Sequence, residues 1–170
     1  TEEERVARRI LLEDAPDLVM HVVDARNLER MLPMTVQLIE AGLPVILVVN
    51  IMDEAERLGI AIDIPLLQER LGIPVVGAAV ARKRGLQEIR GNISCYRKAG
   101  GLLPRYSAWL ENDIAEIMGL LRGTYGLAAK AIALLLQQRD QEITDLVRKT
   151  EGDGFASLEA KIAELNVYMN

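Results

Sequence analysis

The first hundred residues alternate between continuous apolar runs and segments with apolar residues at helical spacing. Three runs have the length and composition of buried strands, at residues 17–23, 45–49 and 73–79. A run that is apolar at nearly every position predicts a strand covered on both faces. Strands that alternate with helices predict right-handed crossovers, so we expect an α/β fold with a parallel sheet.

The segments between these runs carry helix signals. The stripe of Leu32, Val36 and Ile39 predicts one helix, with Pro33 in its first turn. Shorter helices, each bounded by glycine or proline, are expected at residues 53–58 and 64–72 and after Gly85.

The pattern changes after about Gly100, beyond which we predict no strand. Four groups of apolar residues recur at helical spacing between residues 110 and 169. Pro104 can begin the first of these helices. We therefore expect two domains, an α/β domain of residues 1–98 and a small all-helical domain of residues 99–170.

Composition limits the classes of function. Half of the 170 residues are hydrophobic but only 4% are aromatic, so the core must be built from aliphatic side chains. The net charge of −5 argues against a nucleic-acid-binding surface, which is usually basic. The longest apolar runs fall far short of the roughly 20 residues that span a bilayer. Cys95 is the only cysteine and has no histidine at metal-ligand spacing, so no metal site is predicted.

Polar residues follow the second apolar run. Asn50 closes it and Asp53 lies three positions later. Ligands of parallel sheets bind at the carboxyl ends of strands, which places Asp24, Asn50 and residues 79–82 on one edge. A carboxylate can accept hydrogen bonds from the ring N–H and the exocyclic amine of guanine, a pair of donors that adenine lacks. The asparagine amide can brace neighbouring loops, so the pattern indicates a guanine-reading loop.

A structural role explains the same residues. Asn50 and Asp53 can instead cap the helix expected at residues 53–58. The pattern alone leaves both interpretations open. For Asp24 we expect a helix or turn cap, and for His21, the only histidine, a position in the core or facing a helix.

Two longer stretches resemble a known family. The segments VVDARNLER and VVNIMDEAERLGIAIDIPLL are similar to the GTPase domain of ferrous iron transport protein B. The resemblance is dense over residues 2–89. It continues more loosely through LLRGTYGLAAKAIALLLQQRD, which resembles the helical domain that follows the GTPase domain. The resemblance implies a partial P-loop GTPase-like domain with a parallel sheet, followed by a small helical domain.

The resemblance also implies a set of nucleotide-binding residues. The positions that match the base-specificity motif and the second base-contacting loop are Asn50, Ile51, Met52 and Asp53, and Val80, Ala81 and Arg82. Two positions depart from the common pattern. Ile51 stands where many GTPases have lysine, and Val80 stands where serine or threonine is usual.

The phosphate-binding elements of a GTPase are missing from these 170 residues. The sequence has no Gly-x-x-x-x-Gly-Lys-Ser/Thr and no Asp-x-x-Gly before a switch helix. The resemblance implies GTP or GDP as the ligand, with Mg²⁺ held only where a phosphate loop is present. We expect that loop to precede Thr1 in the complete protein, and we predict no catalytic residue in this chain.

The function implied by the resemblance is that of the guanine-nucleotide-binding cytosolic portion of a ferrous iron transporter. GTP hydrolysis would regulate or drive Fe(II) uptake, and the partner would be a membrane domain of the same polypeptide at the cytoplasmic face of the bacterial inner membrane. Two alternatives remain open. One is a soluble GTPase of another branch, and the other is a scaffold that retains the fold without catalysis.

Overall fold

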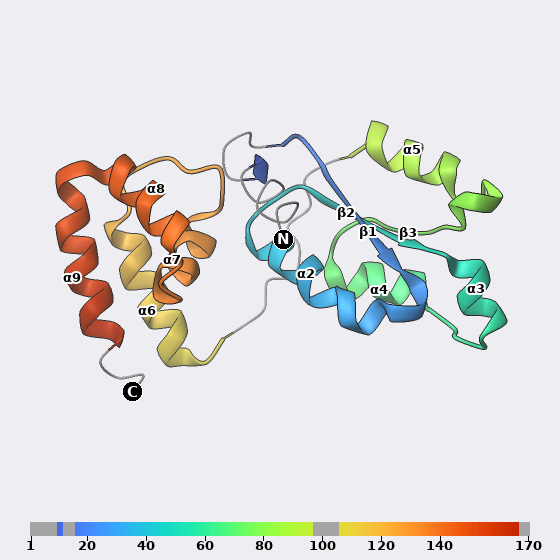
Figure 1. The fold of residues 1–170 in the computed structure, drawn as a ribbon, viewed down its shortest axis with the longest axis horizontal. Helices are drawn as coiled ribbons and strands as arrows, with labels where there is room; N and C mark the ends of the chain where they lie inside the picture. The colour runs from blue at the N-terminus through green and yellow to red at the C-terminus, as the bar shows by residue number, and fades with distance from the viewer. Residues whose placement is uncertain (1–9, 12–15, 97–105, 167–170) are drawn as a thin grey trace. The chain divides into compact units, whose positions relative to one another are not determined.

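The computed structural model describes residues 10–11, 16–96 and 106–166. Residues 16–96 belong to a compact α/β unit and residues 106–166 to a compact helical unit, both drawn in Figure 1. The predicted boundary between residues 98 and 99, and Pro104, lie outside the described residues.

The α/β unit is built around three parallel strands in the order β1-β2-β3, so β2 is central. Its elements in chain order are β1 (Val19–Asp24), the 3-10 turn η1 (Ala25–Asn27), α2 (Leu28–Glu40), β2 (Val45–Asn50), α3 (Met52–Arg57), α4 (Ile64–Leu71), β3 (Val75–Gly77), the 3-10 turn η2 (Val80–Arg82) and α5 (Leu86–Ser94). The predicted α/β class and parallel sheet are confirmed.

β2 forms the centre of this unit because it is covered on both faces. Residues 45–49 are at most 1% exposed. Side chains alternate between the two faces of a strand, so Ile46 and Val48 point to one face together. They pack against Val76 of β3 and Ile89 of α5, whereas α2 contacts β1 and β2.

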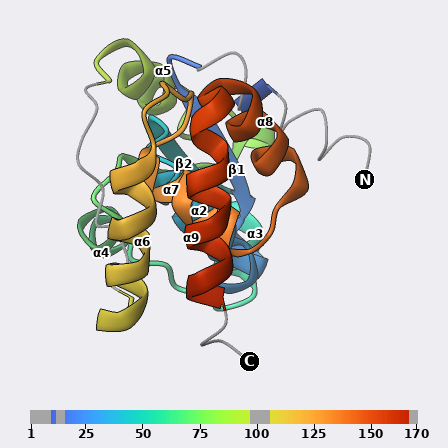
Figure 2. The same ribbon diagram turned by 90° about the vertical axis from the view of Figure 1, so that its left-hand side faces the viewer.

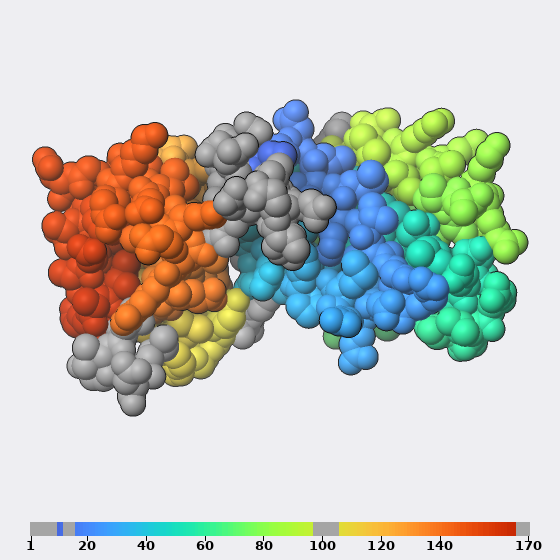
Figure 3. Space-filling model, viewed as in Figure 1, coloured from blue at the N-terminus to red at the C-terminus, as the bar shows by residue number. Residues whose placement is uncertain are grey.

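β1 differs from the prediction that both of its faces would be covered. Met20 and Val22 are 47% and 46% exposed. They pair in register with Ile46 and Val48, so they belong to the face that α5 covers over β2. In Figure 3 the blue surface of this segment lies in view near the yellow-green surface of α5. A continuous apolar run therefore does not show by itself whether other elements cover both faces of the strand.

The opposite face of β1 meets α2 through its histidine. His21 Nδ1 lies 3.0 Å from Oγ1 of Thr35, a fully buried residue of α2. Burial lowers the pKa of His21, because desolvation disfavours the charged imidazolium. The expectation of a helix-facing histidine is confirmed.

α2 begins earlier than predicted, so Pro33 is not in its first turn. The helix starts at Leu28, directly after η1, and Pro33 lies inside it. A proline at that position has no N–H to donate to the carbonyl four residues earlier. Asp24 caps η1 with its side chain, and α2 continues from that turn at Leu28, four residues before the apolar stripe begins at Leu32. The helix ends before Gly42, as predicted.

The third strand is shorter than its apolar run. β3 covers only Val75–Gly77, whereas the prediction extended from residue 73 to 79. Ala78 still donates from its N–H to the carbonyl of Val49 at 2.8 Å, but its own carbonyl accepts from Met52 of α3 at 3.0 Å. The chain therefore turns away from the sheet towards α3, at the edge where the polar residues gather.

The helical unit has its own core. Its elements are α6 (Ala108–Leu120), α7 (Ala129–Gln137), α8 (Gln141–Glu151), the 3-10 turn η3 (Gly152–Gly154) and α9 (Phe155–Asn166), and α6 and α9 lie side by side in Figure 2. The core is mainly aliphatic, as the composition predicted, with Ile114, Ile117, Ile132, Ile143, Val147 and Leu158 at most 2% exposed. The four predicted helices are confirmed, and no strand occurs among residues 106–166.

Within the described parts of the chain, none of the helices combines the length and the hydrophobicity needed to cross a bilayer.

Candidate functional site

The two predicted nucleotide-binding segments meet at the carboxyl edge of the sheet. Asp24 and Asn50 are paired in register at the ends of β1 and β2. The loop that follows β3 returns to the same edge, where the carboxamide oxygen of Asn50 accepts a hydrogen bond from the backbone N–H of Val80 at 3.1 Å. Residues 50–53 and 80–82 are thus adjacent, although about thirty positions separate them in the sequence.

Asn50 braces two loops and does not cap α3. The residue that precedes α3 is Ile51, and it makes no side-chain capping bond. The Asn50 side chain instead reaches across to the loop after β3, where it accepts from Val80. The interpretation of Asn50 as a helix cap is therefore wrong, because its amide is used to join two loops.

Ile51 has an unusual backbone conformation. Its φ is 65° and its ψ is 30°, in the left-handed region. This region is a genuine outlier for a β-branched residue and costs of order 1–3 kcal/mol. The bend turns the chain sharply from β2 into α3, so that Asp53 lies in the first turn of the helix. Because isoleucine carries no turn signal, the sequence alone does not reveal this strain.

Asp53 faces the second loop. Its Oδ2 accepts from Nε of Arg82 at 2.6 Å, and its side chain is 21% exposed, compared with 67% for Arg82. Burial alone would raise the pKa of Asp53, but the hydrogen bond and charge of Arg82, with two backbone N–H groups, outweigh it. The pKa of Asp53 is therefore lowered, and the carboxylate is ionised at neutral pH.

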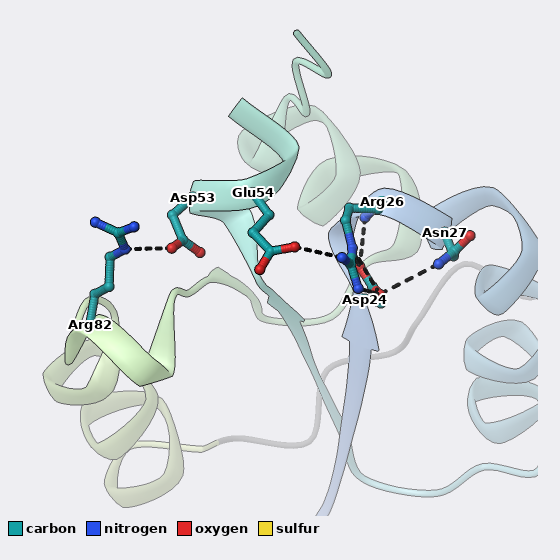
Figure 4. A network of polar contacts seen from close by, with 6 residues as sticks. All are labelled: Asp24, Arg26, Asn27, Asp53, Glu54 and Arg82. Carbon is teal, nitrogen blue, oxygen red and sulfur yellow. Dashed lines mark hydrogen bonds and ion pairs between the residues drawn. The ribbon is translucent and has the colours of Figure 1, made fainter. Parts of the chain in front are cut away.

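A second pair of charges lies beside Asp53, as Figure 4 shows. Asp24 accepts from the backbone N–H of Arg26 at 2.8 Å and from its guanidinium at 2.7 Å, which confirms the expected turn cap. The guanidinium of Arg26 lowers the pKa of Asp24 to about 2. Arg26 also donates to Glu54 of α3 at 2.5 Å.

The whole of α3 is held by arginines from both neighbouring loops. Arg26 of η1 pairs with Glu54, Arg82 of η2 pairs with Asp53, and Arg84 pairs with Glu56 at 2.7 Å. Sequence reasoning missed these pairs. Three acids within four positions of a short helix, with arginines in both flanking loops, are the signal that would have indicated them.

The remaining predicted residues lie in the same two segments as Asp53 and Arg82. Ile51 and Met52 lead from β2 into α3, and Val80 and Ala81 form the start of η2 with their side chains exposed. The first N–H groups of a helical turn have no partner within it. An ionised carboxylate next to backbone N–H donors can bind a planar group that presents both N–H donors and a carbonyl acceptor.

No metal site accompanies this arrangement in the described residues. Among residues 10–11, 16–96 and 106–166, no three His, Cys, Asp or Glu side chains gather so as to hold a metal ion. The acids at the edge of the sheet are paired with arginines instead.

Known proteins share both the sequence and the fold. The family model described as ferrous iron transport protein B matches residues 1–93. The Fe(2+) transporter FeoB of Escherichia coli K12 is 32% identical over 169 residues, which is 99% of this chain and 22% of the transporter. A Porphyromonas gingivalis fusion of Fe(2+) transport protein A with FeoB is 36% identical over 155 residues, 85% of this chain and 18% of that protein.

Solved structures match over nearly the whole chain. NFeoB from S. thermophilus bound to GDP·AlF4⁻ and K⁺ superposes with a TM-score of 0.81 at 28% identity, covering 99% of this chain and 67% of that one. The cytosolic domain of the T. maritima FeoB iron transporter in its GMPPNP form gives a TM-score of 0.81 at 28% identity, with 97% and 69% covered. The chain spans about a fifth of the length of the curated relatives.

Proposed function

Because this chain belongs to the ferrous iron transport protein B family, matching it in the cytosolic GTPase domain and the helical domain that follows, we propose that residues 50–53 and 80–82 read the guanine base of a bound GTP or GDP. The observation that carries the proposal is the hydrogen bond between Asn50 and Val80. This hydrogen bond joins the segment that carries the carboxylate of Asp53 to the turn of residues 80–82, whose backbone N–H groups can donate. Both lie at the carboxyl edge of a parallel sheet, where ligands bind.

Each part of the site has a role in base recognition. The carboxylate of Asp53 accepts from the ring N–H and the exocyclic amine of guanine, and the backbone N–H of Ala81 donates to the guanine oxygen. Asn50 fixes the two loops, while Ile51, Met52, Val80 and the backbone of Arg82 surround the base. Adenine leaves the carboxylate without donors, and an unpaired buried polar group costs about 1–3 kcal/mol. The site therefore selects guanine over adenine.

The phosphates and the magnesium ion need residues that this sequence does not supply. A glycine-rich phosphate loop cradles the phosphates and supplies a Mg²⁺ ligand in P-loop GTPases, and the 170 residues lack its motif. The acids of α3 do not fit that role, because arginines neutralise them. We infer that GTP hydrolysis, regulating or driving Fe(II) uptake, belongs to the complete transporter.

The proposed setting is the cytoplasmic face of the bacterial inner membrane. Its partner is a membrane domain of the same polypeptide, and no nucleic acid takes part. The support is the sequence similarity to Fe(2+) transporters named FeoB. One of the similar solved structures is the cytosolic domain of such a transporter in its GMPPNP form. We retain residues 1–98 and 99–170 as the proposed limits of the GTPase and helical domains.

Competition binding tests the proposed base selectivity. The full-length protein that the gene encodes is titrated with fluorescent GDP, and unlabelled nucleotides are added as competitors. We expect GDP and GTP to displace the probe and ADP and ATP to leave it bound. Equal displacement by ADP and GDP would remove base reading from this site, and no binding of the probe would remove nucleotide binding from the protein.

A further inference from the structure

Arg82 occupies the place at Asp53 that the base is proposed to take. Its Nε donates to Oδ2 of Asp53 at 2.6 Å. A guanidinium group and the edge of guanine offer a carboxylate the same chemistry, a planar carbon that carries neighbouring N–H donors. On the premise of the proposed function, we propose that Arg82 is an intramolecular competitor of guanine, which pairs with Asp53 and must leave it before the base can bind.

Arg82 pairs with Asp53, which is the least exposed acidic side chain of α3. The side chain of Asp53 is 21% exposed, whereas those of Glu54 and Glu56 are 44% and 54% exposed. A partly desolvated carboxylate gains more from a charged donor than one in open water does. Arg82 therefore supplies a hydrogen-bond donor to a carboxylate that partial burial has deprived of some of its hydration.

The same geometry allows Arg82 to leave without disturbing the loops. Its side chain is 67% exposed, so it can rotate into solvent. The position of α3 does not depend on it, because Arg26 still pairs with Glu54 and Arg84 with Glu56. The loop after β3 also remains attached through Asn50. Opening the site is thus a change of one side-chain conformation.

A competitor within the protein weakens the apparent affinity for its ligand. When only a fraction of molecules has the site open, the dissociation constant rises by the reciprocal of that fraction. Although Asp53 is less exposed than the other acids of α3, its partner Arg82 is 67% exposed. Ion pairs with such an exposed partner are weak, so the closed form outweighs the open form by no more than about fivefold. Salt screens such pairs, so we expect the competition to fade as ionic strength rises.

Replacing Arg82 tests the competition directly. In the full-length protein, Arg82→Ala and Arg82→Gln should bind fluorescent GDP roughly two- to fivefold more tightly at low salt, with the gain shrinking at high salt. Arg84→Ala is the matched control. It removes an exposed arginine of the same loop that pairs with α3 through Glu56 and not through Asp53, and it should not tighten GDP binding.

The outcomes separate this inference from the function on which it rests. Unchanged or weaker GDP binding in both Arg82 variants, with Asp53→Asn still weakening GDP, overturns the competition and leaves base reading intact. An equal gain in Arg84→Ala also overturns it, because the effect would then be one of general charge. If Asp53→Asn and the Arg82 variants all bind GDP as the unaltered protein does, the proposed base site itself fails.

Discussion

At the residue scale, the carboxyl edge of the sheet is organised by arginines. Asp24 holds the turn after β1 by accepting from both the backbone and the guanidinium of Arg26. Arg26 in turn reaches Glu54 of α3. One guanidinium therefore connects the end of β1 to the helix that carries the proposed base-reading carboxylate.

The contact between Arg26 and Asp24 has a measurable effect on the pKa of Asp24. It is lowered to about 2 by Arg26, so the carboxylate contributes to folded stability above about pH 4, and this contribution is lost as the pH falls towards 2. Arg26→Ala should raise the pKa of Asp24 towards its ordinary value, with part of the lowering retained through the backbone N–H of residue 26. A pH titration of the carboxyl carbon by NMR measures it. A pKa that stays near 2 in the variant would show that Arg26 is not the cause.

Some of these residues were predictable and others were not. Asp24, Asn50 and Asp53 follow or close strands, so their place at the ligand edge could be read from the pattern. The left-handed conformation of Ile51 could not, because tertiary contacts impose it against the preference of the residue. The partners of Arg26 depend on which loops meet in space, which a one-dimensional pattern does not specify.

At the element scale, the strands and helices of both units follow the sequence pattern closely. The predicted and observed elements differ where contacts with other parts of the fold determine the structure. Val22 of β1 is 46% exposed, although the apolar run predicted a strand covered on both faces. α2 continues from the turn that Asp24 caps and begins ahead of its apolar stripe, which leaves Pro33 inside the helix.

The junction between the second loop and α5 requires glycine. Gly85 has a φ of +86°, and a Cβ built on it would lie 2.9 Å from the carbonyl oxygen of Gly77 and 3.0 Å from Cβ of Ala78. Gly85→Ala should therefore lower the free energy of unfolding by about 1–3 kcal/mol, as judged by urea denaturation. It should also shift the NMR resonances of the loop that carries Val80.

Gly91 provides the control for that substitution. It lies inside α5, and no atom is within 4 Å of a Cβ built there. Gly91→Ala should raise the free energy of unfolding by about 0.5–1 kcal/mol, because alanine loses less backbone entropy in a helix. If both substitutions destabilise equally, the close approach at Gly85 is not the reason for its glycine.

At the scale of the whole molecule, the chain combines two units with separate cores. Ile46 and Val48 belong to the core of the α/β unit, and Ile117 and Ile132 to that of the helical unit. The family relationship spans both units, since similar structures cover 97–99% of the chain. The proposed site uses only the α/β unit, where residues 50–53 and 80–82 meet.

The measurement that tests base reading most directly is an exchange of specificity at Asp53. In the full-length protein, Asp53→Asn should weaken fluorescent GDP binding by about ten- to a hundredfold, because the amide meets the guanine amine with another donor. The same variant should bind xanthosine diphosphate more tightly than the unaltered protein does, since xanthine carries a carbonyl in place of that amine. Unchanged GDP affinity, with no gain for xanthosine diphosphate, would contradict the assignment of Asp53 to the base.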